Sequence, residues 1–145
     1  MVFPVGLILS EKPPYSEIYA HVRRVVATCA DLNVPVKVII ETGLHKSLRT
    51  KIAACIIAAK ARAAFVKTCT GFNAGQATEE DVKLMWRAVQ GYRAPDGQAV
   101  KIKASGGVRT LESCLKMLKA GAERIGTCVS FHASHAISIS YLLLL

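Results

Sequence analysis

Two lysines in this chain stand where a lysine can act as a nucleophile. Lys67 closes the apolar stretch 64–67 and Lys103 closes the stretch 100–103, and both stretches have the composition of β-strands. Because neighbouring strands lie about 5 Å apart, the two ammonium groups are expected within electrostatic reach of each other. Each charge then disfavours protonation of the other, and a neutral amine can attack a carbonyl to form a Schiff base. The alternative interpretation is that both side chains extend to solvent or hold an anion without chemistry.

Loops of small residues follow three of the predicted strands. Their sequences are KTCTG at 67–71, KASGG at 103–107 and GTC at 126–128. Parallel strands bring their carboxyl ends to one edge of a sheet, so these loops are expected to converge. Backbone N–H groups exposed by glycine at a helix start bind phosphate. Glycine and serine also serve purely conformational needs in such turns, and the spacing alone leaves both interpretations open.

The elements that must position these residues alternate along the chain. Strands are predicted at 36–40, 64–67, 100–103 and 123–126, and helices at about 16–30, 46–61, 78–90 and 110–120. A further strand is predicted at 2–9. This alternation predicts an α/β fold in which helices cover a parallel sheet.

Helix ends and buried faces can also be predicted. Ser16 and Thr78 have the chemistry of helix caps, and Gly121 that of a helix stop. Apolar spacing assigns to the buried faces Ile18, Val22, Val25, Val26 and Cys29 in the first long helix, and Val82, Met85, Trp86 and Val89 in the third.

Charge and composition limit the classes of binding partner that the chain is expected to have. The 145 residues carry 19 Lys+Arg against 10 Asp+Glu, a net charge of +9 that suits an anionic partner. The basic residues are dispersed over predicted helices without a tight run or interleaved aromatics, which disfavours nucleic acid. A basic nucleic-acid-binding module remains the third hypothesis, to be recognised by steep salt dependence.

Cysteine and histidine usage indicates a reducing cytoplasm and no metal. The five cysteines are odd in number and lack CxxC spacing. His132 and His135 have no third ligand nearby in sequence and are interpreted as loop residues. No apolar stretch reaches the roughly 20 residues that a membrane helix needs, so no membrane partner is expected.

Four sequence blocks resemble successive blocks of class I, bacterial-type deoxyribose-phosphate aldolases. They are PVKVIIETG (35–43), AAFVKTCTGF (63–72), KIKASGGVRT (101–110) and GAERIGT (121–127), and MVFPVG at the start resembles the fourth barrel strand of that family. The resemblance implies an incomplete (β/α) TIM barrel domain at 1–128, covering roughly the last four to five β/α units. An atypical apolar tail is expected at 129–145. By this resemblance, the chain as a whole is expected to be an amino-terminally truncated member of the family.

The resemblance also implies a reaction and its residues. Lys67 would form the imine, and Lys103 would disfavour protonation of Lys67 and assist proton transfer. The reaction would be reversible cleavage of 2-deoxy-D-ribose 5-phosphate to glyceraldehyde 3-phosphate and acetaldehyde, in deoxyribonucleotide catabolism. The imine itself withdraws electrons, so no cofactor or metal is expected. The residues matching the family's phosphate-binding loops are Thr70, Gly71, Gly106, Gly107, Gly126, Thr127 and Cys128.

Departures from the family pattern qualify the expected activity. The acidic proton-relay residue of the family would align before Met1, and Glu41, which also follows a strand, is assigned no role. Cys69 replaces a serine, and Lys101 shares a strand face with Lys103. An open half-barrel exposes sheet edges that favour self-association, and the chain alone is predicted to be poorly active. A non-catalytic sugar-phosphate-binding or interaction fragment is the second hypothesis.

Overall fold

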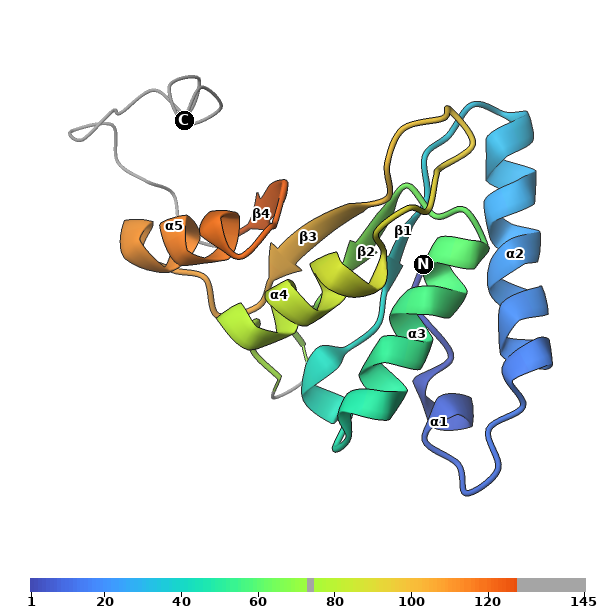
Figure 1. Cartoon of the computed structure of the whole chain (residues 1–145), viewed down its shortest axis with the longest axis horizontal. Coiled ribbons are helices and arrows are strands. Elements are labelled where there is room, and N and C mark those ends of the chain that lie inside the picture. Colours follow the sequence, from blue (N-terminus) through green and yellow to red (C-terminus); the bar gives the residue numbers. More distant parts are fainter. Residues whose placement is uncertain (73–74, 128–145) are drawn as a thin grey trace.

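A computed structural model describes residues 1–72 and 75–127 of the chain. Its sheet contains β1 (Lys37–Ile39), β2 (Phe65–Lys67), β3 (Lys101–Ser105) and β4 (Arg124–Gly126). The strands pair in chain order and every pairing is parallel (Figure 1). The predicted α/β class and the four predicted strands are therefore confirmed, with shifted ends.

Helices connect the strands and cover the sheet. They are α1 (Val5–Ile8), α2 (Tyr15–Asp31), α3 (Leu48–Lys60), α4 (Glu79–Ala88) and α5 (Leu111–Lys119), with a 3-10 turn at Thr42–Leu44. In Figure 1, α3 and α4 lie in front of the sheet and α2 lies to the side of α3. Thr78 caps α4 by accepting from the Asp81 N–H, as predicted, and acidic residues fill the first turn of that helix.

The core lies between the sheet and this helical layer. Val38, Val66 and Ile102 stand at matching positions of β1, β2 and β3 and are fully buried. Since successive side chains of a strand point to opposite faces, the residues between them lie on the other face. That second face is only partly buried and carries Lys37, Ile39, Phe65, Lys67, Lys101 and Lys103.

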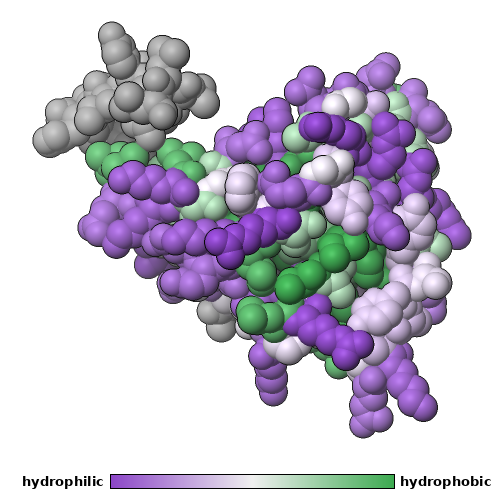
Figure 2. Space-filling view, viewed as in Figure 1, coloured by the Kyte–Doolittle hydropathy of each residue, from purple (hydrophilic) through white to green (hydrophobic). Residues whose placement is uncertain are grey.

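An apolar groove lies on the outside of the helical layer. It runs between α2 and α3, and Tyr19, Ile52 and Ile56 are among its lining residues. Figure 2 shows the corresponding apolar area on the face of the molecule that carries the helices. The lining contains no residue of the loops that follow the strands, so the groove is separate from the predicted site.

The strand predicted at 2–9 is wrong in most of its length. Val2 forms an isolated parallel bridge with Ile39, and the Phe3 N–H donates to the Ile39 carbonyl at 2.8 Å. Pro4 then ends the pairing, because proline has no N–H to donate and its fixed φ suits a helix start. Residues Val5–Ile8 consequently form α1.

Three predictions within the helices are also wrong. Helix α2 begins at Tyr15 after Pro14, so Ser16 lies inside the first turn and caps nothing. Val25 is 39% exposed and Trp86 is 45% exposed. A helix buries only the stripe that meets its neighbours, and these two side chains lie at the margin of that stripe.

Part of the sequence prediction falls outside the described residues. Cys128, His132, His135 and the tail 129–145 belong there. Within the described ranges, no helix is long and apolar enough to cross a membrane.

Candidate active site

Lys67 and Lys103 lie directly opposite each other on neighbouring strands. They are register partners in the β2–β3 pairing, and both occupy the sheet face that the helices leave uncovered. The Thr68 N–H donates to the Lys103 carbonyl at 3.1 Å, which ties the ends of the two strands together. The structure thus brings together the two lysines that the sequence singled out.

Further cations surround this pair. We call Lys37, Lys67, Lys103 and Arg124 the cationic face. Arg124 is the register partner of Lys103 on β4, and the Arg124 guanidinium lies 4.7 Å from the centroid of the Phe65 ring. The Lys37 ammonium lies 5.1 Å from the same centroid. Stacking on an aromatic ring partly compensates a cation for lost hydration, which helps to hold this charge on the sheet.

Burial and like charge both act on Lys103. Burial is the main cause that lowers the pKa of Lys103, and the nearby charge of Lys67 lowers this pKa further. Lys37 and Arg124 act in the same direction. Burial likewise lowers the pKa of Lys37, with Arg124 as the next cause. Burial and the neighbouring cations therefore disfavour protonation of Lys37 and Lys103.

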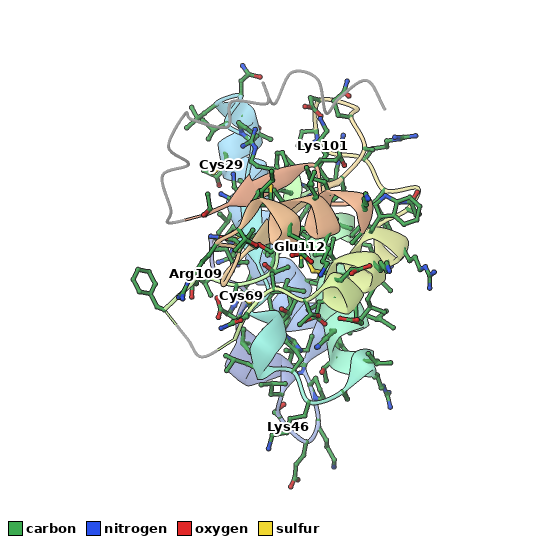
Figure 3. The ribbon with its side chains drawn as sticks, turned by 90° about the vertical axis from the view of Figure 1, so that its left-hand side faces the viewer. Cys29, Lys46, Cys69, Lys101, Arg109 and Glu112 are labelled. Carbon is green, nitrogen blue, oxygen red and sulfur yellow. The ribbon has the colours of Figure 1, made fainter. Side chains whose placement is uncertain are left out.

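The loop after β2 is tied to the loop after β3 through Thr68. The buried Thr68 hydroxyl donates to the Ser105 carbonyl at 2.6 Å and accepts from the Ser105 N–H at 2.9 Å. In Figure 3, Cys69 and Arg109 lie toward the same end of the sheet, whereas Lys101 lies toward the other end. The predicted convergence of these two loops is therefore observed. Thr68 itself was missed, although its place directly after Lys67 was a usable signal.

Glycines allow these loops to pack closely. Gly71, Gly106 and Gly107 adopt positive φ of 100°, 103° and 76°, which side chains rarely adopt. A Cβ on Gly126 would lie 2.6 Å from the Ser105 hydroxyl oxygen and 3.0 Å from Cε of Lys103. Gly126 therefore leaves room for the Lys103 side chain. Thr127 follows β4 and is exposed.

A carboxylate that the sequence analysis left without a role also lies here. Glu41 follows β1, is 2% exposed and accepts a hydrogen bond from the Thr70 N–H. Its backbone is left-handed at φ 54°, a conformation that costs a non-glycine residue on the order of 1–3 kcal/mol. A charged residue directly after a buried strand, at the same edge as Lys67, was the signal available in the sequence.

The described residues offer no metal-binding cluster. Within residues 1–72 and 75–127, no three His, Cys, Asp or Glu side chains lie close enough together to hold a metal ion. The polar groups at the strand ends are instead lysines, hydroxyls, backbone amides and one carboxylate. This set can form an imine, move protons and bind an anion.

Comparison with known proteins assigns the chain to a family. The profile of the DeoC/LacD family aldolases matches residues 5–131. The deoxyribose-phosphate aldolase of Carboxydothermus hydrogenoformans is 43% identical over 129 residues, which are 88% of this chain and 52% of that protein.

Solved structures agree. A Coccidioides immitis protein described as a deoxyribose-phosphate aldolase superposes with a TM-score of 0.76 at 35% identity, covering 88% of this chain and 47% of the other. A deoxyribose phosphate aldolase from Aeropyrum pernix, described as having a unique tetrameric structure, superposes with a TM-score of 0.66 at 28% identity. The match covers 78% of this chain and 45% of the Aeropyrum chain.

The chain spans about half the length of the curated relatives it matches. Its parallel strands and covering helices correspond to an incomplete TIM-barrel fold. The match of the family profile over most of the sequence, with the paired lysines on adjacent strands, shows that this chain belongs to the DeoC/LacD aldolase family.

Proposed function

We propose that this chain carries the Schiff-base centre of a deoxyribose-phosphate aldolase. The observation that carries the proposal is the register pairing of Lys67 and Lys103 on the uncovered sheet face. The reaction is reversible cleavage of 2-deoxy-D-ribose 5-phosphate to glyceraldehyde 3-phosphate and acetaldehyde. The named function of the Carboxydothermus relative supports this substrate.

In this mechanism Lys67 is the nucleophile. Its amine adds to the C1 aldehyde of the open-chain sugar, and loss of water gives a protonated imine. The C3 hydroxyl then loses its proton while the C2–C3 bond breaks, and the electron pair of that bond moves toward the imine nitrogen. Glyceraldehyde 3-phosphate leaves, the resulting enamine takes a proton at C2, and hydrolysis releases acetaldehyde and the free lysine.

Lys103 is proposed to move protons beside this imine. The lowered pKa of Lys103 brings its ammonium closer to the pH at which it can release and recover a proton. Its register pairing with Lys67 supports a role at the same carbon atoms. Gly126 supports this role indirectly, because a larger residue there would displace the Lys103 stem.

The substrate phosphate is proposed to bind at the strand-end loops. Thr70, Gly71, Gly106, Gly107, Gly126, Thr127 and Cys128 are the proposed residues. The positive φ of Gly71, Gly106 and Gly107 supports backbone amides turned toward an anion. The Thr70 N–H is already bound to Glu41, so Thr70 would contribute its hydroxyl rather than its amide.

Compartment and assembly are a further part of the proposal. Cys29, Cys55, Cys69 and Cys114 are free thiols, which supports a reducing cytoplasm. The tetrameric description of the Aeropyrum relative supports a homo-oligomer. Within the described residues β4 pairs only with β3, and its other edge is the proposed contact with a second copy.

The test is borohydride trapping of the imine. The purified chain is incubated with deoxyribose 5-phosphate and borohydride, and the intact mass is measured for wild type, Lys67→Ala and Lys101→Ala. Wild type and Lys101→Ala are expected to gain the mass of the reduced adduct, and Lys67→Ala is expected to gain none. Lys101 is the matched control because it lies on the same face, at the start of β3.

A folded wild type without an adduct would contradict the proposal. Saturable binding of the sugar phosphate in that case would favour the non-catalytic alternative. The basic nucleic-acid-binding alternative would require affinity for nucleic acid that falls steeply with salt. Turnover is measured separately, because imine formation is only the first step of the reaction.

A further inference from the structure

The buried carboxylate of Glu41 has a place in this site. Resting on the proposed function, we propose that Glu41 is a positioning residue for the turn that follows Lys67. Its carboxylate holds the Thr70 N–H and thereby fixes the chain between Lys67 and Gly71. Glu41 acts through this turn and not on the reacting atoms.

The backbone on both sides of Glu41 is bound to the same turn. The Ile40 N–H donates to the Lys67 carbonyl at 3.0 Å, and the Thr42 N–H donates to the Thr68 carbonyl at 3.1 Å. The Glu41 side chain reaches two residues further along the chain and accepts from the Thr70 N–H. Three successive residues after β1 therefore bind the end of β2 and the loop that follows it. The bond from the Thr70 N–H has a carboxylate as its acceptor. Such bonds are stronger than neutral ones.

The conformation of Glu41 indicates that its side chain matters. Its φ of 54° is left-handed, and glycine would adopt this value without strain. Strained residues persist where their surroundings fix them, and they gather at functional sites. Only a residue with a side-chain acceptor can bind the Thr70 N–H, and glycine has none. The strain is therefore explained by the hydrogen bond that it permits.

The same bond bears on where a phosphate can lie. A phosphate cannot accept from the Thr70 N–H while the carboxylate does so. Two anions also repel each other at short range. Glu41 therefore keeps the substrate phosphate off the Thr70 N–H. The Thr70 hydroxyl and the Gly106–Gly107 loop, whose glycines have positive φ, are left to bind it.

The first measurement is hydrogen exchange of the Thr70 amide by NMR. Glu41→Gly removes the carboxylate and also relieves the left-handed strain, so the folded backbone gains no new strain. Glu41→Gln keeps an acceptor oxygen. Thr42→Val is the matched control, because the Thr42 hydroxyl contacts the Cys69 sulfur at 3.4 Å and not the Thr70 amide. Exchange at Thr70 is expected to rise about tenfold or more in Glu41→Gly only.

The second measurement is the rate of imine trapping on Lys67 in the same variants. Glu41→Gly is expected to slow trapping about tenfold, and Glu41→Gln is expected to recover most of the rate. Inorganic phosphate is titrated in parallel, with protection by phosphate expected at the Gly106 and Gly107 amides. If Glu41→Gly does not fold, Glu41→Met replaces it, because methionine keeps the length without an oxygen acceptor.

The outcomes separate this inference from the proposed function. Unchanged Thr70 exchange in Glu41→Gly would overturn the inference, as would equal slowing of trapping by Thr42→Val. A wild type that forms no imine, but whose Thr70 amide is released by Glu41→Gly, would overturn the aldolase proposal while leaving the positioning of the turn in place.

Discussion

Alternate residues of β3 meet two different environments. Ile102 and Ala104 are fully buried on the side covered by helices, whereas Lys101 and Lys103 lie on the partly exposed side. The first face gains stability from apolar burial. On the second face, burial and then the accumulated like charge lower the pKa of Lys103, so the charge there opposes folding. Strand alternation thus separates the residues that stabilise the fold from those that carry the chemistry, one residue apart.

Ile102→Ala is expected to have the largest effect on this comparison. Truncating a fully buried isoleucine leaves a cavity and costs about 2–5 kcal/mol in the free energy of unfolding. Urea unfolding followed by circular dichroism measures this loss. Lys101→Ala, one position away on the other face, is expected to change stability by about 0.5 kcal/mol or less. Equal losses in the two variants would contradict the separation of the faces.

Gly126→Ala tests the face that carries the lysines, and its expected effect on stability is smaller than that of Ile102→Ala. The added Cβ would meet the side chains of Ser105 and Lys103, which can move, so the expected cost is about 1 kcal/mol. The displaced Lys103 is expected to slow imine trapping more than stability alone explains. Gly6→Ala is the matched control, because a Cβ there meets nothing within 4 Å. A variant that loses stability but traps at the wild-type rate would count against the role of Lys103.

The smallest expected effect is a pH dependence of stability. Burial, and then the charge of Lys67, lower the pKa of Lys103 below 10.5, so the unfolded chain binds more protons just below that pH. Stability therefore rises as pH increases from the lowered folded pKa toward 10.5, where the penalty of the charge disappears. Urea midpoints between pH 7 and about 10.5 are expected to rise less in Lys103→Met than in wild type.

Lys116 provides a control of opposite sign for this measurement. Its hydrogen bond to Glu112 raises the pKa of Lys116 above 10.5, so its contribution to stability is lost only at higher pH. Lys116→Met is therefore expected to leave unchanged the rise of the urea midpoint with pH below pH 10.5. An identical slope in wild type and Lys103→Met would show that the charge of Lys103 does not oppose folding.

The sequence predicted much of the fold because its signals were local. Apolar runs ending at Lys67 and Lys103 indicated strands, and parallel pairing of consecutive strands placed the lysines together. Thr78 was recognisable as a cap from its own chemistry and the acids after it. The loops carrying Gly71 and Gly106 were likewise recognisable from composition.

What could not be predicted depends on distant neighbours. The place of Glu41 after a strand indicated the edge where it lies, but its bond goes to an amide 29 positions away in sequence, and no periodicity encodes such a bond. The exposure of Val25 and Trp86 depends on how far each adjacent helix reaches across the surface. The early segment failed because one bridge at Val2 does not extend past Pro4 into a strand.

Trp86 offers an optical view of the molecule that requires no label. It is the sole tryptophan of the sequence, and a Cβ on Gly121 would lie 2.7 Å from its Cγ. The Trp86 indole, carried by α4, thus packs against the turn that ends α5. It lies on a helix and not on the strands that carry the lysines. Its fluorescence emission reports the contact between α4 and the α5 turn, and a red shift would register the opening of that contact while Lys67 and its surroundings remain spectroscopically silent.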